Sequence, residues 1–438
     1  MPAPSKPAQS TALLTDRYEL TMLDASLLDG RALRRSVFEL FARRLPTGRR
    51  FGVVAGTGRL LDLVQDFRFG PDDLAWLKSQ RIVSDATLDW LEGFRFSGRI
   101  RGYREGELYF PGSPILVVEG TFAEAVVLET LALSVLNYDS AVASAAARMV
   151  SAAEGRPLAE MGSRRTGERS AIAAARAAYI AGFSATSNLE AGRSWGVPTM
   201  GTAAHSFTLL HDSEEEAFAA QVAAMGTGTT LLVDTFDVTE GIATAVRVAG
   251  TELGAIRIDS GDLGVLVREA RAQLDALGAT KTRITVTNDL DEHAIASLRS
   301  APVDSYGVGT SLVTGSGAPA AGMVYKLVAH LGDDDEWIPV GKRSDGKVSV
   351  GGRKQPVRAL KSGTATSEDI YVEDPPVKND AGRRLLVDLV LDGDSVAEHI
   401  GPAGVAAARE HHAHAIGELP PEAFALSRGE PVLGTRYL

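Results

Sequence analysis

The spacing of apolar residues changes part-way along the chain. Up to residue 120, short stretches of alternating apolar and polar residues predict strands, at 36–45 and in the segments between 94 and 119 that glycine and proline interrupt. A short helix is expected at 13–23, and a loop or short strand at 52–58. This pattern indicates an N-terminal region of α+β type.

From residue 121 the apolar spacing becomes helical. Alanine-rich stretches at 121–153 and 168–181 predict two long helices. Short apolar runs then alternate with amphipathic helices, and five such runs predict strands at 198–201, 229–234, 255–259, 283–287 and 305–308. Repeated βα units predict a parallel sheet, and polar residues at the carboxyl ends of the strands favour a partial or complete α/β barrel over an open sheet.

Composition narrows the class of protein. The 438 residues are 45% apolar and 23% charged, which is typical of a folded globular chain of two or more domains. The absence of cysteine excludes disulfides and thiolate chemistry, and the net charge of -11 argues against nucleic acid or a membrane surface as main partner. No uninterrupted apolar run approaches the roughly 18 residues that span a bilayer, and residues 1–9 read as a disordered tail without a signal sequence. A cytoplasmic protein is expected.

Polar residues suited to chemistry follow each predicted strand. Because the carboxyl ends of parallel strands meet at one edge, these residues predict a single site. In chain order they are His205 with Ser206; Asp234 and Asp237; Arg257, Asp259, Ser260 and Asp262; Asn288 and Asp289; and Gly309, Thr310 and Ser311. Two alternatives stay open: Arg257 and Asp259 could pair in a surface loop while Asp262 only caps the next helix, and His205 could be a capping or core histidine.

Seven motifs occur in a fixed order between residues 13 and 326: TDRYELTM, EMGSRRTGERS, ATSN, GTAAHSF, RIDSGD, TNDLD and GVGTS. This set resembles the nicotinate phosphoribosyltransferase family, which belongs to the type II phosphoribosyltransferases, while the C-terminal part of the chain matches weakly. The resemblance implies an incomplete α/β barrel at 121–325 and a second α+β domain built from both chain ends, 1–120 and 326–438. It also implies a homodimer with active sites shared between subunits.

The reaction that the resemblance implies joins nicotinate to phosphoribosyl pyrophosphate, giving nicotinate mononucleotide and pyrophosphate, with ATP hydrolysis and Mg²⁺. The same resemblance makes His205 a phosphohistidine, with Ser206 orienting the ring or the phosphate. A neutral imidazole is a competent phosphoryl acceptor near pH 7. ATP is therefore expected as a co-substrate.

The residues themselves suit a pyrophosphate-displacement reaction. Arg257 suits the phosphates, and Asp259 and Asp289 suit the ribose hydroxyls. Asp259 and Asp262 could also hold Mg²⁺, directly or through water. Backbone amides and hydroxyls at Gly309 and Thr310 suit the 5′-phosphate, and the hydroxyl of Ser260 is a further candidate for substrate binding.

The pyridine site is assigned by resemblance. Arg164 and Arg165 lie beside the substrate carboxylate in that family, and Tyr18 stacks on the pyridine from the neighbouring subunit. Ser187 stands where nicotinamide-using relatives have an aspartate, which favours nicotinate as substrate. Met161 stands where many relatives have phenylalanine, so stacking on both faces of the ring is not implied here.

Other functions stay open at this point. The chain could use nicotinamide or quinolinate, or it could be a barrel that binds phosphorylated metabolites as a sensor or scaffold without turnover. The cluster His411-His412-Ala413-His414 could hold a metal or could be a solvated helix end, and the lack of acidic or cysteine partners at ligand spacing favours the helix end.

Overall fold

The computed structural model describes residues 10–342, 349–372 and 382–438. Within it the chain forms two compact units: both chain ends, up to Ala141 and from Ala320 onward, make up one unit, and Val142–Pro319 makes up the other. The expectation of a disordered tail at residues 1–9 lies outside the described residues. Each unit is described below by itself.

The Val142–Pro319 unit is built on a six-stranded sheet whose strands all pair in parallel. The strand order is β7-β6-β11-β10-β9-β8. The strands are β6 (Leu158–Glu160), β7 (Ala185–Thr186), β8 (Thr230–Leu232), β9 (Ala255–Ile258), β10 (Arg283–Val286) and β11 (Ser305–Val308). This parallel half-barrel confirms the predicted incomplete α/β barrel.

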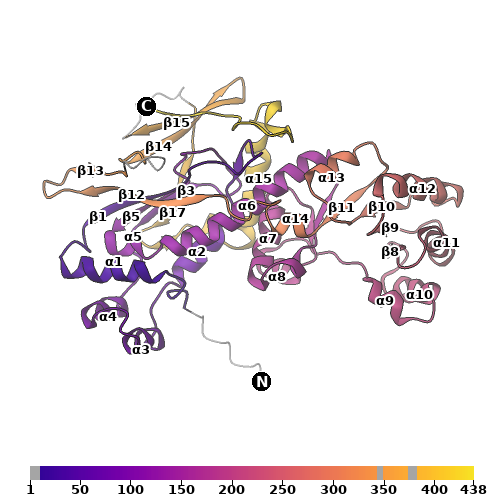
Figure 1. The fold of residues 1–438 in the computed structure, drawn as a ribbon, viewed down its shortest axis with the longest axis horizontal. Coiled ribbons are helices and arrows are strands. Elements are labelled where there is room, and N and C mark those ends of the chain that lie inside the picture. The colour runs from indigo at the N-terminus through magenta and orange to yellow at the C-terminus, as the bar shows by residue number, and fades with distance from the viewer. Residues whose placement is uncertain (1–9, 343–348, 373–381) are drawn as a thin grey trace. The chain divides into compact units, whose positions relative to one another are not determined.

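Helices follow the strands and cover one side of the sheet. Figure 1 shows α10, α11 and α12 along the outer side of β8, β9 and β10. The helices of this unit are α7 (Glu168–Ile180), α8 (Leu189–Trp195), α9 (His205–Leu210), α10 (Glu214–Met225), α11 (Val238–Ala249), α12 (Leu263–Ala276), α13 (Glu292–Ser297) and α14 (Thr310–Val313). Ser213 accepts a hydrogen bond from the Glu216 amide and so caps α10, as its sequence predicts.

Successive side chains along each strand of this sheet point to opposite faces. Ile256, Ile258, Ile284 and Val286 are fully buried, whereas Arg257, one position out of phase, turns to the opposite face. The register of β9 and β10 pairs Arg257 with Thr285. The face without the large apolar side chains is therefore free to carry a ligand site.

Three expectations about local structure need correction. Residues 198–201 do not form a strand, because only Thr199 bridges to Thr186. The short strands β6 and β7 were not expected, although β6 lies beside β11 inside the sheet. The stretch 121–153 is two helices, α5 (Phe122–Val126) and α6 (Glu129–Ala153).

The apolar stretch through α5 and α6 bears on membrane association. Residues 122–153 are long and apolar enough to cross a bilayer by length and composition, but 67% of the relevant window is buried inside the protein. That degree of burial is expected of a core helix.

The unit made from both chain ends contains a seven-stranded sheet in the order β13-β12-β1-β5-β3-β17-β18. Strand β1 (Arg35–Ala42) pairs antiparallel with β5 (Leu116–Thr121) and with β12 (Met323–Leu331), so the N-terminal and C-terminal parts share one sheet. The remaining strands are β3 (Arg99–Tyr103), β13 (Trp337–Pro339), β17 (Leu386–Leu391) and β18 (Asp394–Ser395). The strands predicted at 36–45 and between 94 and 119 are confirmed.

Helices and two smaller sheets complete this unit. Four N-terminal helices and the first part of α6 pack on one core with the sheet: α1 (Arg17–Leu28), α2 (Thr57–Gln65), α3 (Pro71–Ser79) and α4 (Asp85–Glu92). The C-terminal part adds a sheet in the order β16-β14-β15-β19. Helix α15 (Gly401–Gly417) precedes β19, the last strand of the chain. The strands of the smaller sheets are β2 (Gly52–Val53), β4 (Leu108–Tyr109), β14 (Lys354–Lys361), β15 (Thr364–Val372), β16 (Arg383–Arg384) and β19 (Thr435–Tyr437).

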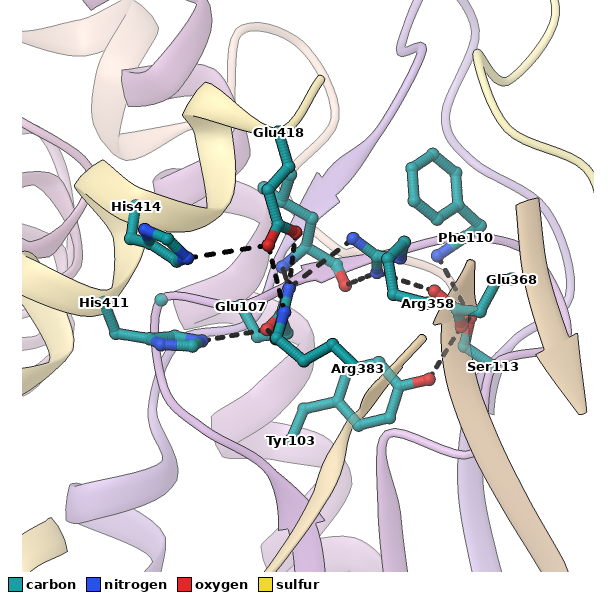
Figure 2. Close-up of polar contacts among 12 residues, drawn as sticks. Tyr103, Glu107, Phe110, Ser113, Arg358, Glu368, Arg383, His411, His414 and Glu418 are labelled. Atoms are coloured by element: carbon teal, nitrogen blue, oxygen red, sulfur yellow. Dashed lines mark hydrogen bonds and ion pairs between the residues drawn. The ribbon is translucent and has the colours of Figure 1, made fainter. Parts of the chain in front are cut away.

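A buried polar cluster joins the N-terminal and C-terminal segments of this unit. Figure 2 shows Glu107 between Arg383 and His411, with Arg358 next to Glu368. Arg358 donates to Glu368 over 2.7 Å with both side chains fully buried, and His411 Nε2 lies 2.8 Å from Glu107. The surrounding cations hold the pKa of Glu107 far below its usual range, although burial alone would raise it.

The histidine cluster at 411–414 is part of this packing. His412 is buried and its Nδ1 lies 2.9 Å from the carbonyl oxygen of Gly106, while His414 is exposed and lies 3.6 Å from Glu418. The expected solvated helix end therefore describes His414 and not His412. Within the described residues no group of three or more His, Cys, Asp or Glu side chains could hold a metal ion.

Candidate active site

A cavity of about 370 Å³ lies at the carboxyl ends of the parallel strands. Strand-end residues from β6, β7, β9, β10 and β11 face it, as the sequence predicts for a parallel sheet. Nine of the predicted site residues line it: Arg164, Arg165, Ser187, Arg257, Asp259, Asn288, Asp289, Gly309 and Thr310. The structure thus brings together residues that are as much as 146 positions apart in the sequence, from Arg164 to Thr310.

The other predicted residues lie outside this lining. His205 begins α9 beside the cavity, and Ser206 follows it as an exposed residue. Asp262 is exposed and caps α12, because its Oδ1 accepts hydrogen bonds from the amides of Gly264 and Val265. Tyr18 belongs to the other unit, where it lies in the first turn of α1 with 46% of its surface exposed.

His205 has two distinct ring environments. Its Nδ1 lies 3.1 Å from the Thr235 hydroxyl, whereas its Nε2 faces two carboxylates, 3.8 Å from Asp259 Oδ2 and 4.0 Å from Asp234 Oδ1. Its side chain is 40% exposed. A proton on Nδ1 would donate to Thr235 and would leave the Nε2 lone pair accessible.

Asp234 is a central residue of this site that the sequence marked only as a strand-end acid. Its Oδ2 accepts hydrogen bonds from the Asp259 amide over 2.8 Å and from the Ser260 hydroxyl over 2.7 Å. Its Oδ1 is buried and has no hydrogen-bond partner among the described residues. A buried carboxylate oxygen that faces His205 and lacks a donor is suited to a cation or a proton donor brought by a ligand.

Arg257 is held at the centre of the cavity wall. One of its Nη1 protons is donated to the Thr202 hydroxyl over 2.5 Å, Nη1 also donates to the Ala203 carbonyl over 3.2 Å, and Nη2 lies 3.7 Å from Asp259. Asp259 in turn accepts from Thr287 over 2.5 Å. Burial lowers the pKa of Arg257, which Asp259 opposes.

Two loops that carry Arg164, Arg165 and Ser187 are fixed by the buried side chain of Glu160. Its carboxylate accepts hydrogen bonds from the Gly162 amide and from the Thr186 hydroxyl, and its carbonyl accepts from the Ser187 amide over 2.9 Å. Burial raises the pKa of Glu160. Sequence reasoning missed this residue, because a buried acid in a three-residue strand has no periodic signal.

Comparison with known proteins decides the family. A family model described as the nicotinate phosphoribosyltransferase (NAPRTase) N-terminal domain matches residues 13–137. Nicotinate phosphoribosyltransferase pncB1 of Mycobacterium tuberculosis (strain CDC 1551 / Oshkosh) is 59% identical over 436 residues, which cover 97% of this chain and 95% of that protein. The chain belongs to the nicotinate phosphoribosyltransferase family. The resemblance was expected to be weak beyond residue 326, but this relative covers nearly the whole chain.

More distant proteins match this chain as well. Nicotinate phosphoribosyltransferase of Bacillus subtilis (strain 168) is 37% identical over 375 residues, covering 83% of this chain and 76% of that protein. The crystal structure of human nicotinic acid phosphoribosyltransferase has a TM-score of 0.81 at 26% identity, covering 95% of this chain and 96% of that one. Nicotinate-nucleotide pyrophosphorylase from Pyrococcus furiosus shares the fold, with a TM-score of 0.76 at 22% identity over 97% and 99% of the two chains.

The position of Met161 in this nicotinate phosphoribosyltransferase is explained by close packing. A Cβ at Gly307 would lie only 2.7 Å from Met161 Sδ and 2.6 Å from Thr287 Cγ2, so any larger residue there would force Met161 or Thr287 to shift. Met161 lines the cavity, and its thioether can pack on an aromatic face. A second cavity of about 210 Å³, also lined by Met161 and Arg257, continues along the same face toward the strand starts.

The acids of the site fit a magnesium ion that is shared with phosphates. Mg²⁺ in phosphoryl-transfer sites is usually bound by one or two carboxylates together with substrate oxygens and water. Asp234 Oδ1, which has no hydrogen-bond donor in the described part of the chain, and Asp259 Oδ2 both lie within 4.0 Å of His205 Nε2. Carboxylate oxygens are the protein ligands that such an ion prefers, so Asp234 and Asp259 are the residues that would hold it.

Proposed function

We propose that the protein is an ATP-dependent nicotinate phosphoribosyltransferase of the cytoplasm that makes nicotinate mononucleotide from nicotinate and phosphoribosyl pyrophosphate. One observation carries the proposal: a single strand-end cavity combines the arginines Arg164, Arg165 and Arg257 with the acids Asp259 and Asp289. Three cations suit a carboxylate and a pyrophosphate, and two acids suit ribose hydroxyls. The relative that is 59% identical over nearly the whole chain bears the same name.

The pyridine end of the cavity suits a carboxylate. Arg164 and Arg165 come from the 3-10 helix Ser163–Arg165, and Ser187 follows strand β7 across the same cavity. Arginine can bind a carboxylate through two parallel hydrogen bonds, and serine can donate a further one. Nicotinate, which is ionised at neutral pH, is therefore preferred over nicotinamide.

The transfer step breaks the bond between ribose C1 and pyrophosphate and forms the bond between C1 and the pyridine nitrogen. Pyrophosphate leaves with the electron pair, so Arg257 stabilises the negative charge that develops on it. Asp259 and Asp289 hold the ribose hydroxyls, and Gly309 with Thr310 binds the 5′-phosphate. The Ser260 hydroxyl donates a hydrogen bond to Asp234 and so helps to fix the strand ends that bind the ribose.

Coupling to ATP uses His205. Its Nε2 attacks the γ-phosphorus of ATP, ADP leaves, and the phosphohistidine later transfers its phosphoryl group to water. Thr235 keeps the proton on Nδ1, and Asp234 and Asp259 stabilise the positive imidazole ring. Ser206, the next residue of α9, is placed to donate to the phosphoryl group.

Asp234 and Asp259 would hold Mg²⁺ together with substrate phosphates. When bound, the ion would neutralise negative charge on the phosphates during phosphoribosyl transfer and during phosphoryl transfer from ATP. Asp262 would reach the ion through water, because its Oδ1 already accepts hydrogen bonds from two helix amides.

A homodimer with shared sites is part of the proposal. Tyr18 and Met22 lie four residues apart on α1 and expose 46% and 36% of their surfaces, so they form a short apolar stripe on that helix. Leu14, in the bend before the helix, exposes 48% of its surface. A hydrogen bond to Glu129 restrains the Tyr18 hydroxyl, and burial together with this acid raises its pKa, so that the phenol stays neutral. Such a stripe supports contact with a second copy, whose pyridine site Tyr18 would cover.

One experiment tests the activity directly. The protein is incubated with phosphoribosyl pyrophosphate and Mg²⁺ and with nicotinate, nicotinamide or quinolinate in turn, with and without ATP, and the mononucleotide is identified by mass. Nicotinate mononucleotide should form, and ATP should increase its yield. Mononucleotide from nicotinamide or quinolinate alone, or none from any pyridine, would overturn the proposal.

A further inference from the structure

The guanidinium of Arg257 is tied to the segment that leads into His205. Its Nη1 donates to the Thr202 hydroxyl over 2.5 Å and to the Ala203 carbonyl over 3.2 Å. Residues 201–204 have no regular secondary structure, and α9 begins at His205 directly after them. The segment is therefore restrained on the cavity side mainly by one side chain from strand β9.

A second path joins the same two residues. Arg257 Nη2 lies 3.7 Å from Asp259 Oδ2, and that same oxygen lies 3.8 Å from His205 Nε2. Arg257, Asp259, His205 and the backbone back to Thr202 thus form a closed ring of contacts. A change at any member alters the position or charge environment of the others.

The Thr202 contact competes with a phosphate ligand. A hydroxyl and a carbonyl are neutral acceptors, whereas hydrogen bonds from arginine to phosphate oxygens are charge-assisted and roughly twice as strong. A pyrophosphate bound across the Nη1 and Nη2 end of Arg257 would therefore compete with Thr202 and Ala203 for the Nη1 protons. The segment has room to respond, because a side chain at Gly201 would meet no other atom within 4 Å.

We propose that Thr202 is a positioning residue that couples occupancy of the phosphoribosyl pyrophosphate site to His205. The inference rests on the proposed function and adds the means by which its two half-reactions communicate. With Arg257 free of phosphate, Thr202 and Ala203 hold His205 beside Asp259. With pyrophosphate on Arg257, the segment 201–204 is released and His205 moves relative to its acids.

Reciprocity makes the coupling measurable from either side. If phosphate binding at Arg257 changes the state of His205, the state of His205 must change phosphate affinity by the same factor. Removing the Thr202 hydroxyl breaks one path of the ring and leaves the catalytic groups in place. The rate of ATP hydrolysis should then no longer depend on whether the phosphoribosyl pyrophosphate site is occupied.

The test compares Thr202→Val, which keeps the shape of the side chain and removes its hydroxyl, with Thr202→Ser, which keeps the hydroxyl. ADP and nicotinate mononucleotide are measured in the same reaction, with and without phosphoribosyl pyrophosphate. Wild type and Thr202→Ser should respond to phosphoribosyl pyrophosphate and keep one ratio of ADP to mononucleotide. In Thr202→Val that ratio should rise by about fivefold or more, as a typical coupling free energy implies.

Hydrogen exchange at residues 201–204 provides a readout that does not depend on turnover. Magnesium pyrophosphate should increase exchange there in wild type and should have a smaller effect in Thr202→Val, in which only the contact between Arg257 and the Ala203 carbonyl remains to be released. An unchanged product ratio in Thr202→Val, or slower exchange in wild type on adding pyrophosphate, would overturn the inference. Failure of wild type to make mononucleotide or to hydrolyse ATP would instead overturn the proposed function.

Discussion

Nε2 of His205 lies 3.8 Å from Oδ2 of Asp259. The residue proposed to accept phosphate from ATP therefore sits against the acid proposed to hold the ribose. Two reactions that share one acid can influence each other without a large movement of the chain.

His205→Ala should abolish ATP hydrolysis and phosphoenzyme formation. Slow synthesis of nicotinate mononucleotide without ATP should remain, because the cavity residues that bind phosphoribosyl pyrophosphate are unchanged. ATP labelled at the γ-phosphate and product analysis measure the two effects separately. His293→Ala is the matched control, because His293 is exposed on α13 outside the cavity lining. Undiminished ATP turnover in His205→Ala would show that another residue takes the phosphate.

Arg257→Ala should lower kcat/KM for phosphoribosyl pyrophosphate on the order of 10²-fold or more, as loss of one charge-stabilising group commonly does. The physical reason is the loss of the cation that faces the leaving pyrophosphate. Arg247→Ala serves as control, since Arg247 pairs with Glu215 on the surface. A rate within a few-fold of wild type would place Arg257 outside the reacting centre.

Ser187→Asp should raise KM for nicotinate and leave KM for phosphoribosyl pyrophosphate nearly unchanged. A carboxylate about 4 to 5 Å from that of nicotinate costs roughly 3 to 4 kcal/mol at an effective dielectric near 20, which is a factor of some hundreds in binding. Ser187→Asn adds nearly the same volume without charge and separates steric from electrostatic effects. If both variants bind nicotinate as wild type does, selectivity is set elsewhere.

Glu368→Ala should destabilise the unit made from both chain ends by about 3 to 5 kcal/mol, because it leaves the fully buried Arg358 without its closest carboxylate. Urea unfolding followed by circular dichroism measures the change. Asp394→Ala removes one partner of an exposed pair with Arg95 and should cost no more than about 1 kcal/mol. Equal losses of unfolding free energy in the two variants would show that the buried pair of Arg358 and Glu368 contributes no more to stability than an exposed pair does.

Glu19 should make stability depend on pH. Burial raises its pKa to about 7, although hydrogen bonds from Thr130 and Thr15 oppose the shift. The folded state therefore holds the Glu19 proton more tightly than the unfolded state, whose value is 4.5. The resulting stabilisation is complete below pH 4.5 and is lost as pH rises through about 7, at about 1.4 kcal/mol per unit of pKa difference.

Glu19→Gln, which resembles the protonated acid, should flatten this dependence. The free energy of unfolding is measured for both proteins from pH 5 to 8. Wild type should lose more stability than the variant across that range, and parallel curves would contradict the prediction.

Local sequence was a good guide where an element carries its own periodicity. The short apolar runs at 255–259 and 283–287 predicted β9 and β10. It failed where an element exists only through its neighbours. β6 is three residues long and depends on pairing with β11, and residues 198–201 look like a strand but supply one bridge.

The site shows the same division. Residues recognisable by type at a strand end, such as Arg257 and Asp289, lie in the cavity wall. The contributions of Asp234 and Glu160 depend on which amides and hydroxyls the fold turns toward them. Asp234 is distinguished by its Oδ1, which has no hydrogen-bond partner within residues 10–342, 349–372 and 382–438. Spacing along a chain cannot supply that information, because it arises from strand register.

The contact between Glu107 and Arg383 has a consequence for how the protein is made. These residues are 276 positions apart, and the whole Val142–Pro319 unit lies between them in the chain. During synthesis Glu107 has no contact with Arg383 until the last part of the chain has been made. By then the Val142–Pro319 unit is already complete. Contacts of such long sequence separation form slowly. We therefore expect refolding to be biphasic, with the parallel sheet forming first and the paired chain ends closing later, and truncation before β16 should leave residues around Glu107 prone to aggregation.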